Sequence, residues 1–198
     1  DIIDNEMADF REGLLTGRTA ELYRTERLKE ICTDIVWSMI RQVQQGKIKE
    51  MYFEQPFGRK KDLPPVKVNV GDQEVLIRGT IDRMDVLDNG GSEAVRIVDY
   101  KTGGDFIDPD YMRSGYKLQL MIYLAASQKE PAGVFYFKIK DVDVDADRVK
   151  VIYGEEALEE RITSSYKLEG IMVNDSSLLE AMDGQISPSS DVIPVKYS

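Results

Sequence analysis

Three charged residues, one before a pair of glycines and two after it, could do chemistry together. The stretch RGTIDRMDVLDNGGSEAVRIVDYKTG carries Asp82 before the pair, and Asp99 and Lys101 after it. A tight turn centred on Gly90-Gly91 would set the two acids directly opposite each other on adjacent strands, with Cβ atoms about 5 Å apart. Lys101, two residues beyond Asp99, would project from the same face of the sheet. A register shift of one residue would instead place the acids on opposite faces.

Two opposed carboxylates repel each other, and the repulsion raises the pKa of one of them unless a cation lies between. Mg²⁺ suits such a pair because it binds one or two carboxylates, keeps several waters and reaches substrate phosphates. Bound to Asp82 and Asp99, it could polarise a scissile phosphate and lower the pKa of an attacking water. Lys101 could then orient that water or stabilise the developing charge. Spacing alone leaves open an ordinary surface hairpin with Asp–Lys ion pairs.

The elements that must position these residues follow from hydrophobic periodicity. An amphipathic helix is predicted at residues 20–45, with Cys32 on its buried apolar face. A second helix is predicted to begin at Asp108-Pro109 and to end near Ser127. Further helices are predicted at residues 155–165 and 176–182, and strands at 50–57, 66–70, 74–88, 93–101, 132–140 and 147–153. This order predicts an α/β (α+β) fold, in which helices flank a mixed central sheet.

Composition narrows the possible functions. The chain has 198 residues, a net charge of −10, no histidine and one cysteine. These counts exclude a Ser-His-Asp triad, an intramolecular disulfide, nearly every common zinc site and an iron–sulfur centre built from this chain alone. Residues 141–191 hold thirteen acids against four bases. The acidity therefore argues against non-specific nucleic-acid binding by the whole surface, but leaves room for a site in the near-neutral middle.

The chain is expected to form one domain, residues 1–198. Because it starts with Asp1 and ends without an obvious closing element, we expect it to be a piece of a longer polypeptide. It contains no run of about eighteen apolar residues, so no membrane span is predicted. A cytoplasmic location is the expectation.

Three short motifs resemble a known family. GTIDRMD, RIVDYKTG and KLQLMIY match, in order and spacing, the motifs G-x-x-D, D-x-K and Q-x-x-x-Y of the PD-(D/E)XK nuclease superfamily, in its RecB-like branch. The resemblance implies a restriction-endonuclease-like core and a Mg²⁺-dependent deoxyribonuclease, acting as an exonuclease, in which Mn²⁺ can substitute. It also implies a helicase–nuclease complex for recombinational repair of double-strand breaks, with single-stranded DNA and a helicase subunit as partners.

The same resemblance implies roles for individual residues. It makes metal ligands of Asp82, Asp99 and the backbone carbonyl of Tyr100, and a catalytic lysine of Lys101. Gln119 and Tyr123 lie four residues apart and so share one face of a helix. They would steady the metal site or the DNA backbone, although a helix face merely packed on the sheet is an equal alternative.

Two further residues, Arg83 and Glu54, have expected positions, and the chain departs from the family pattern in two ways. Arg83 is expected to be an exposed structural arginine or a phosphate contact, and Glu54 lies at the family's upstream acidic position. Members of this branch usually carry an upstream histidine at the metal, and some carry clustered cysteines that hold an iron–sulfur cluster. This chain has neither, so we expect it to lack the cluster and to need further segments for activity. The alternative is a nuclease fold that guides a DNA strand without cutting it.

Overall fold

The computed structural model describes residues 2, 5–6, 19–60, 62–104, 106–140, 162 and 165–195. The chain divides into two compact units, Asp1–Ile40 with Lys140–Ser165, and Arg41–Ile139 with Tyr166–Ser198. The single domain expected from the sequence stays a prediction. The predicted strand at residues 147–153 lies outside the described residues, as does nearly all of the predicted helix at 155–165.

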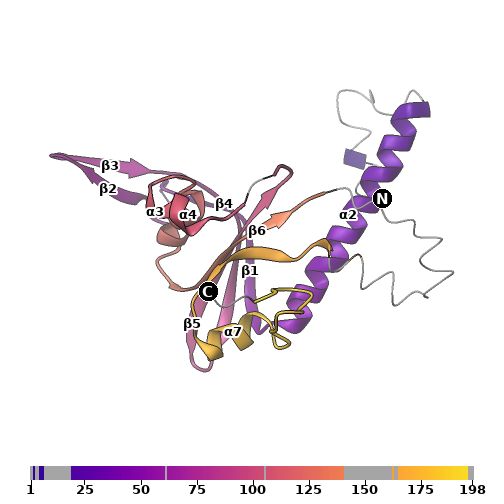
Figure 1. The fold of residues 1–198 in the computed structure, drawn as a ribbon. Helices are drawn as coiled ribbons and strands as arrows, with labels where there is room; N and C mark the ends of the chain where they lie inside the picture. The colour runs from indigo at the N-terminus through magenta and orange to yellow at the C-terminus, as the bar shows by residue number, and fades with distance from the viewer. Residues whose placement is uncertain are drawn as a thin grey trace. The chain divides into compact units, whose positions relative to one another are not determined.

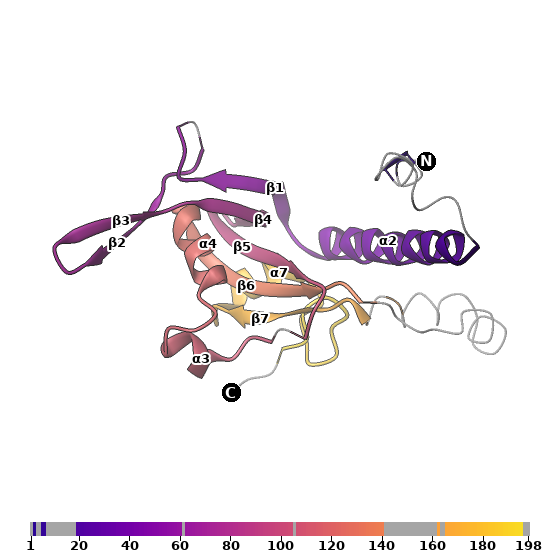
Figure 2. The same ribbon diagram turned by 90° about the horizontal axis from the view of Figure 1, so that it is seen from above.

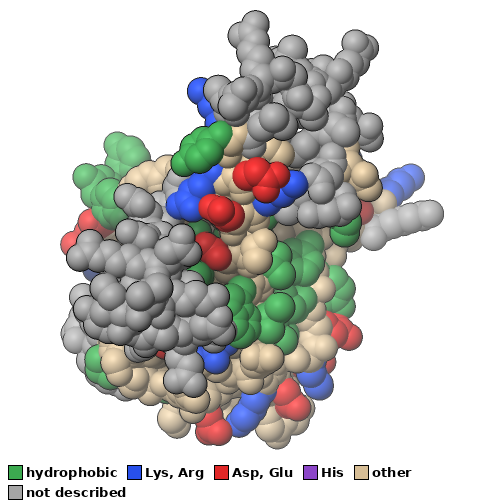
Figure 3. Space-filling view, turned by 90° about the vertical axis from the view of Figure 1, so that its right-hand side faces the viewer, with side chains coloured by type: hydrophobic (Ala, Val, Ile, Leu, Met, Phe, Trp, Pro, Cys, Tyr) green, Lys and Arg blue, Asp and Glu red, His purple; other side chains and the backbone are tan. Residues whose placement is uncertain are grey.

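Helix α2 (Thr19–Gln45) confirms the predicted amphipathic helix, but its apolar stripe is not fully buried. Leu28, Val36 and Ile40 are exposed, and Cys32 is half-buried, so the predicted burial of this cysteine is wrong. Hydrophobic side chains are visible at the surface on the side of the molecule drawn in Figure 3. Within the described residues, no helix is both long and apolar enough to cross a membrane.

The second unit is built on a five-stranded sheet with the strand order β1-β4-β5-β6-β7 (Figure 1). The strands are β1 (Ile48–Phe57), β4 (Gly79–Asn89), β5 (Ser92–Lys101), β6 (Glu130–Lys138) and β7 (Leu168–Met172). Neighbours are antiparallel except β5 and β6, which are parallel and therefore need a crossover connection. The mixed sheet with flanking helices confirms the predicted fold class, while β7 was not predicted.

The connection from β5 to β6 contains two helices rather than the single one predicted. α3 (Pro109–Arg113) begins at the expected signal, with Asp108 as its N-cap and Pro109 in its first turn. α4 (Gln119–Ser127) follows after a break. Gly115 has φ 85° and Lys117 has φ 53°. A continuous right-handed helix cannot pass through two residues in the left-handed region, so the chain turns here.

The long strand predicted from residue 74 onward is also interrupted. Its first part is β3 (Gln73–Ile77), which pairs with β2 (Val66–Val70) in a separate two-stranded sheet. Figure 2 shows this hairpin extending away from the main sheet. The interruption falls at Arg78, where a Cβ added to Gly58 (φ 89°) would lie 2.4 Å from the Arg78 Cβ. Only a glycine allows the chain after β1 to pass Arg78 this closely.

The two faces of the main sheet are covered by different helices. The front face, defined by Met84, Val86, Val95 and Ile97, packs against Leu120 of α4 in one buried apolar cluster. The back face, defined by the alternate residues of the same strands, lies against α7 (Ser176–Met182), a helix predicted with these bounds. The central strands β4, β5 and β6 are therefore buried on both faces for most of their length. What projects from the front face near the end of β5 meets α4.

Candidate active site

The β4–β5 hairpin has the register that the sequence predicts. Its pairs run from Asn89↔Ser92 at the turn to Arg83↔Val98, and Gly90 and Gly91 form the two-residue turn with φ 66° and φ 116°. Positive φ at both turn residues is the reason for two glycines here. One step beyond the last pair lie Asp82 and Asp99, which share the front face with Met84 and Ile97.

The two acids are held in different ways. The backbone N–H of Tyr100 donates to Asp82 Oδ2 at 3.1 Å, which fixes the Asp82 carboxylate beside β5. The Asp99 side chain is 1% exposed, and its Oδ2 lies 2.7 Å from Lys101 Nζ. Lys101 itself is half-buried. A charged carboxylate this deeply buried requires a cationic partner, and Lys101 provides one.

Helix α4 completes this cluster. Gln119 Oε1 accepts a hydrogen bond from Lys101 Nζ at 3.0 Å, and Gln119 Nε2 donates to the Tyr123 hydroxyl at 2.7 Å. The predicted shared face of Gln119 and Tyr123 is thus confirmed, and it points at the sheet. Asp99, Lys101, Gln119 and Tyr123 form one continuous polar chain, which we term the Asp–Lys–Gln–Tyr chain. Burial raises the pKa of Tyr123, with further contributions from the charges of Asp82 and Asp99, so its hydroxyl stays neutral.

Two aromatic rings pack against the Asp–Lys–Gln–Tyr chain, and neither ring was identified from the sequence. Lys101 Nζ lies 5.4 Å from the centroid of the Tyr136 ring, within the range of a cation–π contact. The Phe57 ring packs edge-on against Tyr123, with centroids 6.1 Å apart. Tyr136 pairs with Asp99 across the parallel strands. Only knowledge that β6 lies beside β5 could have identified it.

The position of Arg83 contradicts both roles expected from the sequence, an exposed structural arginine and a phosphate contact. Because it alternates with Asp82 along β4, it projects from the back face, where it is fully buried and contacts no solvent. Its Nε and Nη2 donate to the two oxygens of Asp85 at 2.8 Å, and Nη1 donates to Gln42 Oε1 at 3.2 Å. Arg83 is therefore neither an exposed arginine nor a phosphate contact on the front face.

A second buried arginine completes this back-face cluster. Arg96 Nε donates to Asp85 Oδ2 at 2.7 Å, and Nη1 donates to the carbonyl of Met182 in α7. Burial alone would raise the pKa of the Asp85 carboxyl, but Arg96 and Arg83 outweigh it and hold that pKa below its usual value. The pKa of Arg83 is raised because Asp85 outweighs burial, whereas burial lowers the pKa of Arg96. We term Arg83, Asp85 and Arg96 the buried charge cluster.

Glu54 lies on β1, the edge strand next to β4. The register of β1 with β4, from Phe53↔Arg83 to Gln55↔Ile81, places Glu54 level with Asp82. Its φ is 48°, a left-handed conformation that costs a non-glycine residue free energy. The Glu54 side chain is exposed.

The donor atoms fit a hard divalent cation. Asp82 and Asp99 supply two carboxylates on neighbouring strands, and Tyr100 lies between Asp99 and Lys101, where its carbonyl is the third predicted ligand. Within the described residues, no group of three or more acidic or cysteine side chains gathers around a metal position. A set of two carboxylates and a carbonyl matches Mg²⁺, which keeps several waters and binds phosphate oxygens.

The sequence matches the same class of protein as the site. Residues 2–188 match the PD-(D/E)XK nuclease superfamily, and the chain belongs to it. It is similar to an ATP-dependent helicase/deoxyribonuclease subunit of Caldanaerobacter subterraneus subsp. tengcongensis, with 34% identity over 209 residues, covering 100% of this chain and 18% of the relative. The corresponding subunit of Clostridium kluyveri is 32% identical over 206 residues, covering 98% of this chain and 18% of the relative. The chain thus spans less than a fifth of the length of these relatives.

The family resemblance inferred from the three motifs is confirmed. The structure also brings the motif side chains into one place, since a hydrogen bond joins the second motif to the third and another joins Asp82 of the first to the backbone of β5. Their individual roles in binding a metal or in catalysis stay predictions.

Proposed function

We propose that this chain hydrolyses phosphodiester bonds of DNA in a Mg²⁺-dependent reaction, as an exonuclease. The single observation that carries the proposal is the Asp–Lys–Gln–Tyr chain next to Asp82, within a nuclease fold. Asp82, Asp99 and the Tyr100 carbonyl are the proposed metal ligands, and Mn²⁺ is expected to substitute for Mg²⁺. When bound there, the ion would polarise the scissile phosphate and offset its negative charge.

The side chains of this site have distinct proposed roles. Lys101, held between Asp99 and Gln119, presents an ammonium group that can orient the attacking water and stabilise negative charge developing on the phosphate. Gln119 fixes the direction of the ammonium group, and Tyr123 fixes the amide of Gln119. The pKa of Tyr123 is raised by burial, so the phenol remains a neutral hydrogen-bonding group throughout the neutral pH range. Prior orientation of these groups lowers the barrier because little reorganisation is left for the transition state.

The relatives suggest the biological setting. They are named as a subunit of an ATP-dependent helicase/deoxyribonuclease. On that basis we propose that the chain works with the helicase subunit of an AddAB-type complex, on single-stranded DNA, in the repair of double-strand breaks by recombination. The proposed location is the cytoplasm. With a single cysteine, Cys32, the chain supplies too few thiolates to hold an iron–sulfur cluster by itself.

A second candidate function is a scaffold that guides a DNA strand without cutting it. The observation that favours it is the absence of any histidine from the chain, because the relatives' branch usually places one at the metal. Both candidates predict DNA binding, but only the first predicts that the bound strand is cleaved.

Cleavage of end-labelled single-stranded DNA in Mg²⁺ separates the two candidates. The assay uses the complete natural protein that carries this sequence, with Asp99→Ala and Lys101→Ala as variants. Each should lower the cleavage rate by about 10²- to 10³-fold, the usual cost of removing one group that stabilises the transition state. The matched controls are Glu74→Ala and Lys67→Ala, which break an exposed Lys–Glu pair at 3.2 Å on the β2–β3 hairpin and should leave the rate unchanged.

Two results would overturn the proposal. Full activity in either site variant would refute the assignment of these residues. A wild-type protein that binds DNA without cutting it, in Mg²⁺ and in Mn²⁺, would establish the scaffold function instead.

A further inference from the structure

Three exposed aromatic rings lie on the segment that joins β5 to α4. Phe106 is 48% exposed, Tyr111 49% and Tyr116 65%. Their rings form a chain of edge-on contacts, with centroids 6.1 Å apart from Phe106 to Tyr111 and 6.3 Å apart from Tyr111 to Tyr116. Lys117 Nζ lies 4.3 Å from the centroid of the Phe106 ring. We term Phe106, Tyr111 and Tyr116 the aromatic step.

The aromatic step is held in place by its own backbone. Asp108 accepts hydrogen bonds from the N–H groups of Asp110 and Tyr111 and so caps α3. The backbone N–H of Tyr116 donates to the carbonyl of Tyr111 at 2.9 Å, which fixes the backbone positions from which these two rings project. Aromatic side chains ordered in advance lose little conformational entropy when a flat ligand stacks on them.

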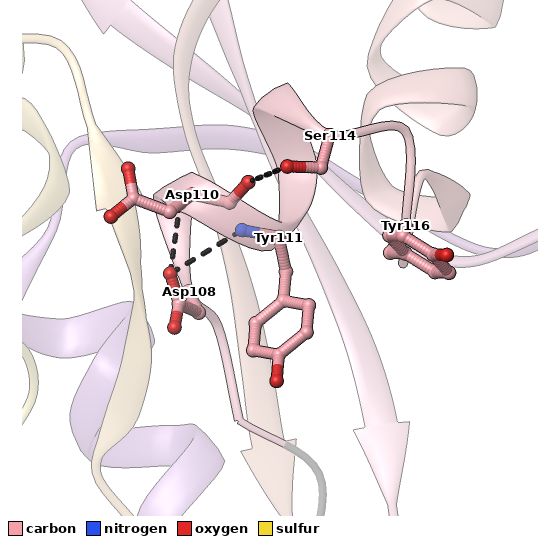
Figure 4. Close-up of a pocket in the computed structure, with 5 residues that line it drawn as sticks. All are labelled: Asp108, Asp110, Tyr111, Ser114 and Tyr116. Atoms are coloured by element: carbon pink, nitrogen blue, oxygen red, sulfur yellow. Dashed lines mark hydrogen bonds between the residues drawn. The ribbon is translucent and has the colours of Figure 1, made fainter.

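A pocket of about 210 Å³ opens beside two of these rings (Figure 4). Its lining residues are Asp108, Asp110, Tyr111, Ser114 and Tyr116. The pocket is smaller than the roughly 300–1,000 Å³ of sites for drug-sized molecules, which suits a single ring system. Asp110 is paired with Arg113 at 2.8 Å, and Asp108 accepts helix N–H groups through Oδ1. A carboxylate oxygen can accept more than one hydrogen bond, so the lining can also accept from the amino group of a base. The lining residues that the structure describes contribute no cationic side chain for a phosphate, which favours a base over the DNA backbone.

The aromatic step lies close to the candidate active site along the chain. The segment that carries it starts directly after Lys101 and ends at Gln119, two members of the Asp–Lys–Gln–Tyr chain. Tyr116 precedes Gln119 by three residues, so their Cα atoms are separated by at most about 11 Å. A strand with one phosphate at Lys101 can therefore bring a nearby base to Tyr116.

We propose that the aromatic step stacks an unpaired base of the DNA strand whose phosphate lies at the candidate active site. The proposal rests on the proposed nuclease function and adds to it a contact that positions the substrate strand. Because bases inside a duplex are already stacked on their neighbours, only a single strand or a frayed end can offer a free base face to Tyr116. Every base has such a face, so the contact is tolerant of sequence.

A double-mutant cycle between protein and DNA tests this contact. Single-turnover cleavage by the complete protein is measured on single-stranded oligonucleotides that are intact or carry one abasic site at successive positions. Tyr116→Ala and Tyr111→Ala remove a stacking ring, Tyr116→Phe keeps the ring, and Tyr23→Ala is the control because Tyr23 is 73% exposed on α2, in the other unit.

At one position, the abasic site should slow the wild-type protein by about 5- to 150-fold, the range expected for stacking of one base on an aromatic ring. Tyr116→Ala should slow cleavage of intact DNA by a similar factor and should lose nothing more on that abasic strand. Tyr116→Phe keeps the ring and should retain the dependence on that base, and Tyr23→Ala should behave as wild type. Losses that multiply independently at every position, for both Tyr116→Ala and Tyr111→Ala, would overturn the proposal.

Failure of the nuclease function is distinguishable from failure of the stacking contact. If the wild type cuts no DNA, the nuclease proposal fails, and if Asp99→Ala cuts as well as the wild type, the assignment of the active site fails. The same cycle is then measured by equilibrium binding of the same oligonucleotides in Ca²⁺. Coupling between Tyr116 and one base position would support the aromatic step as a base-binding site, and independent effects at all positions would overturn it.

Discussion

Removal of the charge of Asp85 is expected to destabilise the protein strongly. Asp85 is fully buried and accepts three charge-assisted hydrogen bonds, at 2.8, 2.8 and 2.7 Å, from Arg83 and Arg96. Asp85→Asn keeps the shape of the side chain but leaves two buried guanidinium groups without their counter-charge. Breaking a buried ion pair in this way costs about 3–5 kcal/mol. That is a large part of the total free energy of unfolding of a typical domain, about 5–15 kcal/mol.

Urea denaturation followed by circular dichroism measures this loss. The matched control is Glu180→Gln on α7, in the same unit, which breaks an exposed ion pair with Lys47 at 2.9 Å. An exposed pair contributes at most about 1 kcal/mol, so the control should unfold nearly as the wild type does. If Asp85→Asn lost no more free energy of unfolding than Glu180→Gln, the described packing of the sheet's back face would be wrong.

The pH dependence of the same difference provides an independent check. The folded-state pKa of Asp85 is held below its unfolded value, which is about 3.9. The carboxylate therefore contributes its full stabilisation above about pH 4, and this contribution is lost as the pH falls below that value. The gap between wild type and Asp85→Asn should be constant from about pH 5 to about pH 7 and should narrow in acid. A gap that widened in acid would refute the sign of the shift.

Three further predictions concern the candidate site and the sheet. Gln119→Ala removes the acceptor that orients Lys101, so the kcat of DNA cleavage should fall by about 10²-fold. Tyr123→Phe should lower kcat by less, because the contact of Gln119 with Lys101 remains. An unchanged kcat in both variants would argue against the orienting roles. Chelation of divalent ions by EDTA should abolish cleavage, and added Mg²⁺ or Mn²⁺ should restore it; cleavage that persists in EDTA would exclude the proposed metal requirement. A Cβ at Gly170 would lie 2.1 Å from a backbone carbonyl oxygen of β6. Gly170→Ala should therefore lower the free energy of unfolding, measured in urea, by about 1–3 kcal/mol or more. Gly104→Ala is the control, because a Cβ there meets open space and should not lower it.

Local sequence signals predicted the structure well where it depends on neighbouring residues. The register of the β4–β5 hairpin follows from Gly90-Gly91, because a two-residue turn fixes which residues face each other. The shared face of Gln119 and Tyr123 follows from helical spacing alone, and the 2.7 Å hydrogen bond confirms it. The three motifs were sufficient to predict the superfamily, which the match over residues 2–188 confirms.

The predictions that were wrong depend on contacts or conformations that periodicity does not report. The helix predicted from Asp108 to Ser127 is broken because the chain turns left-handed at Gly115 and Lys117. Arg83 could not be placed, since an arginine in a strand is equally compatible with solvent and with a buried partner until the residues behind the sheet are known. The exposed side of α2 was predicted to be buried because an amphipathic pattern shows which side is apolar, but not what covers it.

The sequence by itself was enough to predict the register of the β4–β5 hairpin, and with it that Asp82, Asp99 and Lys101 would share one end of one sheet face. Strand alternation and a glycine turn are local properties of the chain. Only the tertiary structure decided that β6 lies parallel to β5 and that α4 packs over that face, which sets Gln119 against Lys101 and the ring of Tyr136 beside it. The physical reason is how far apart in the sequence the interacting residues lie. Hydrogen-bond geometry within a turn or a helix involves residues a few positions apart, whereas the choice of a packing partner depends on apolar surface buried between distant segments.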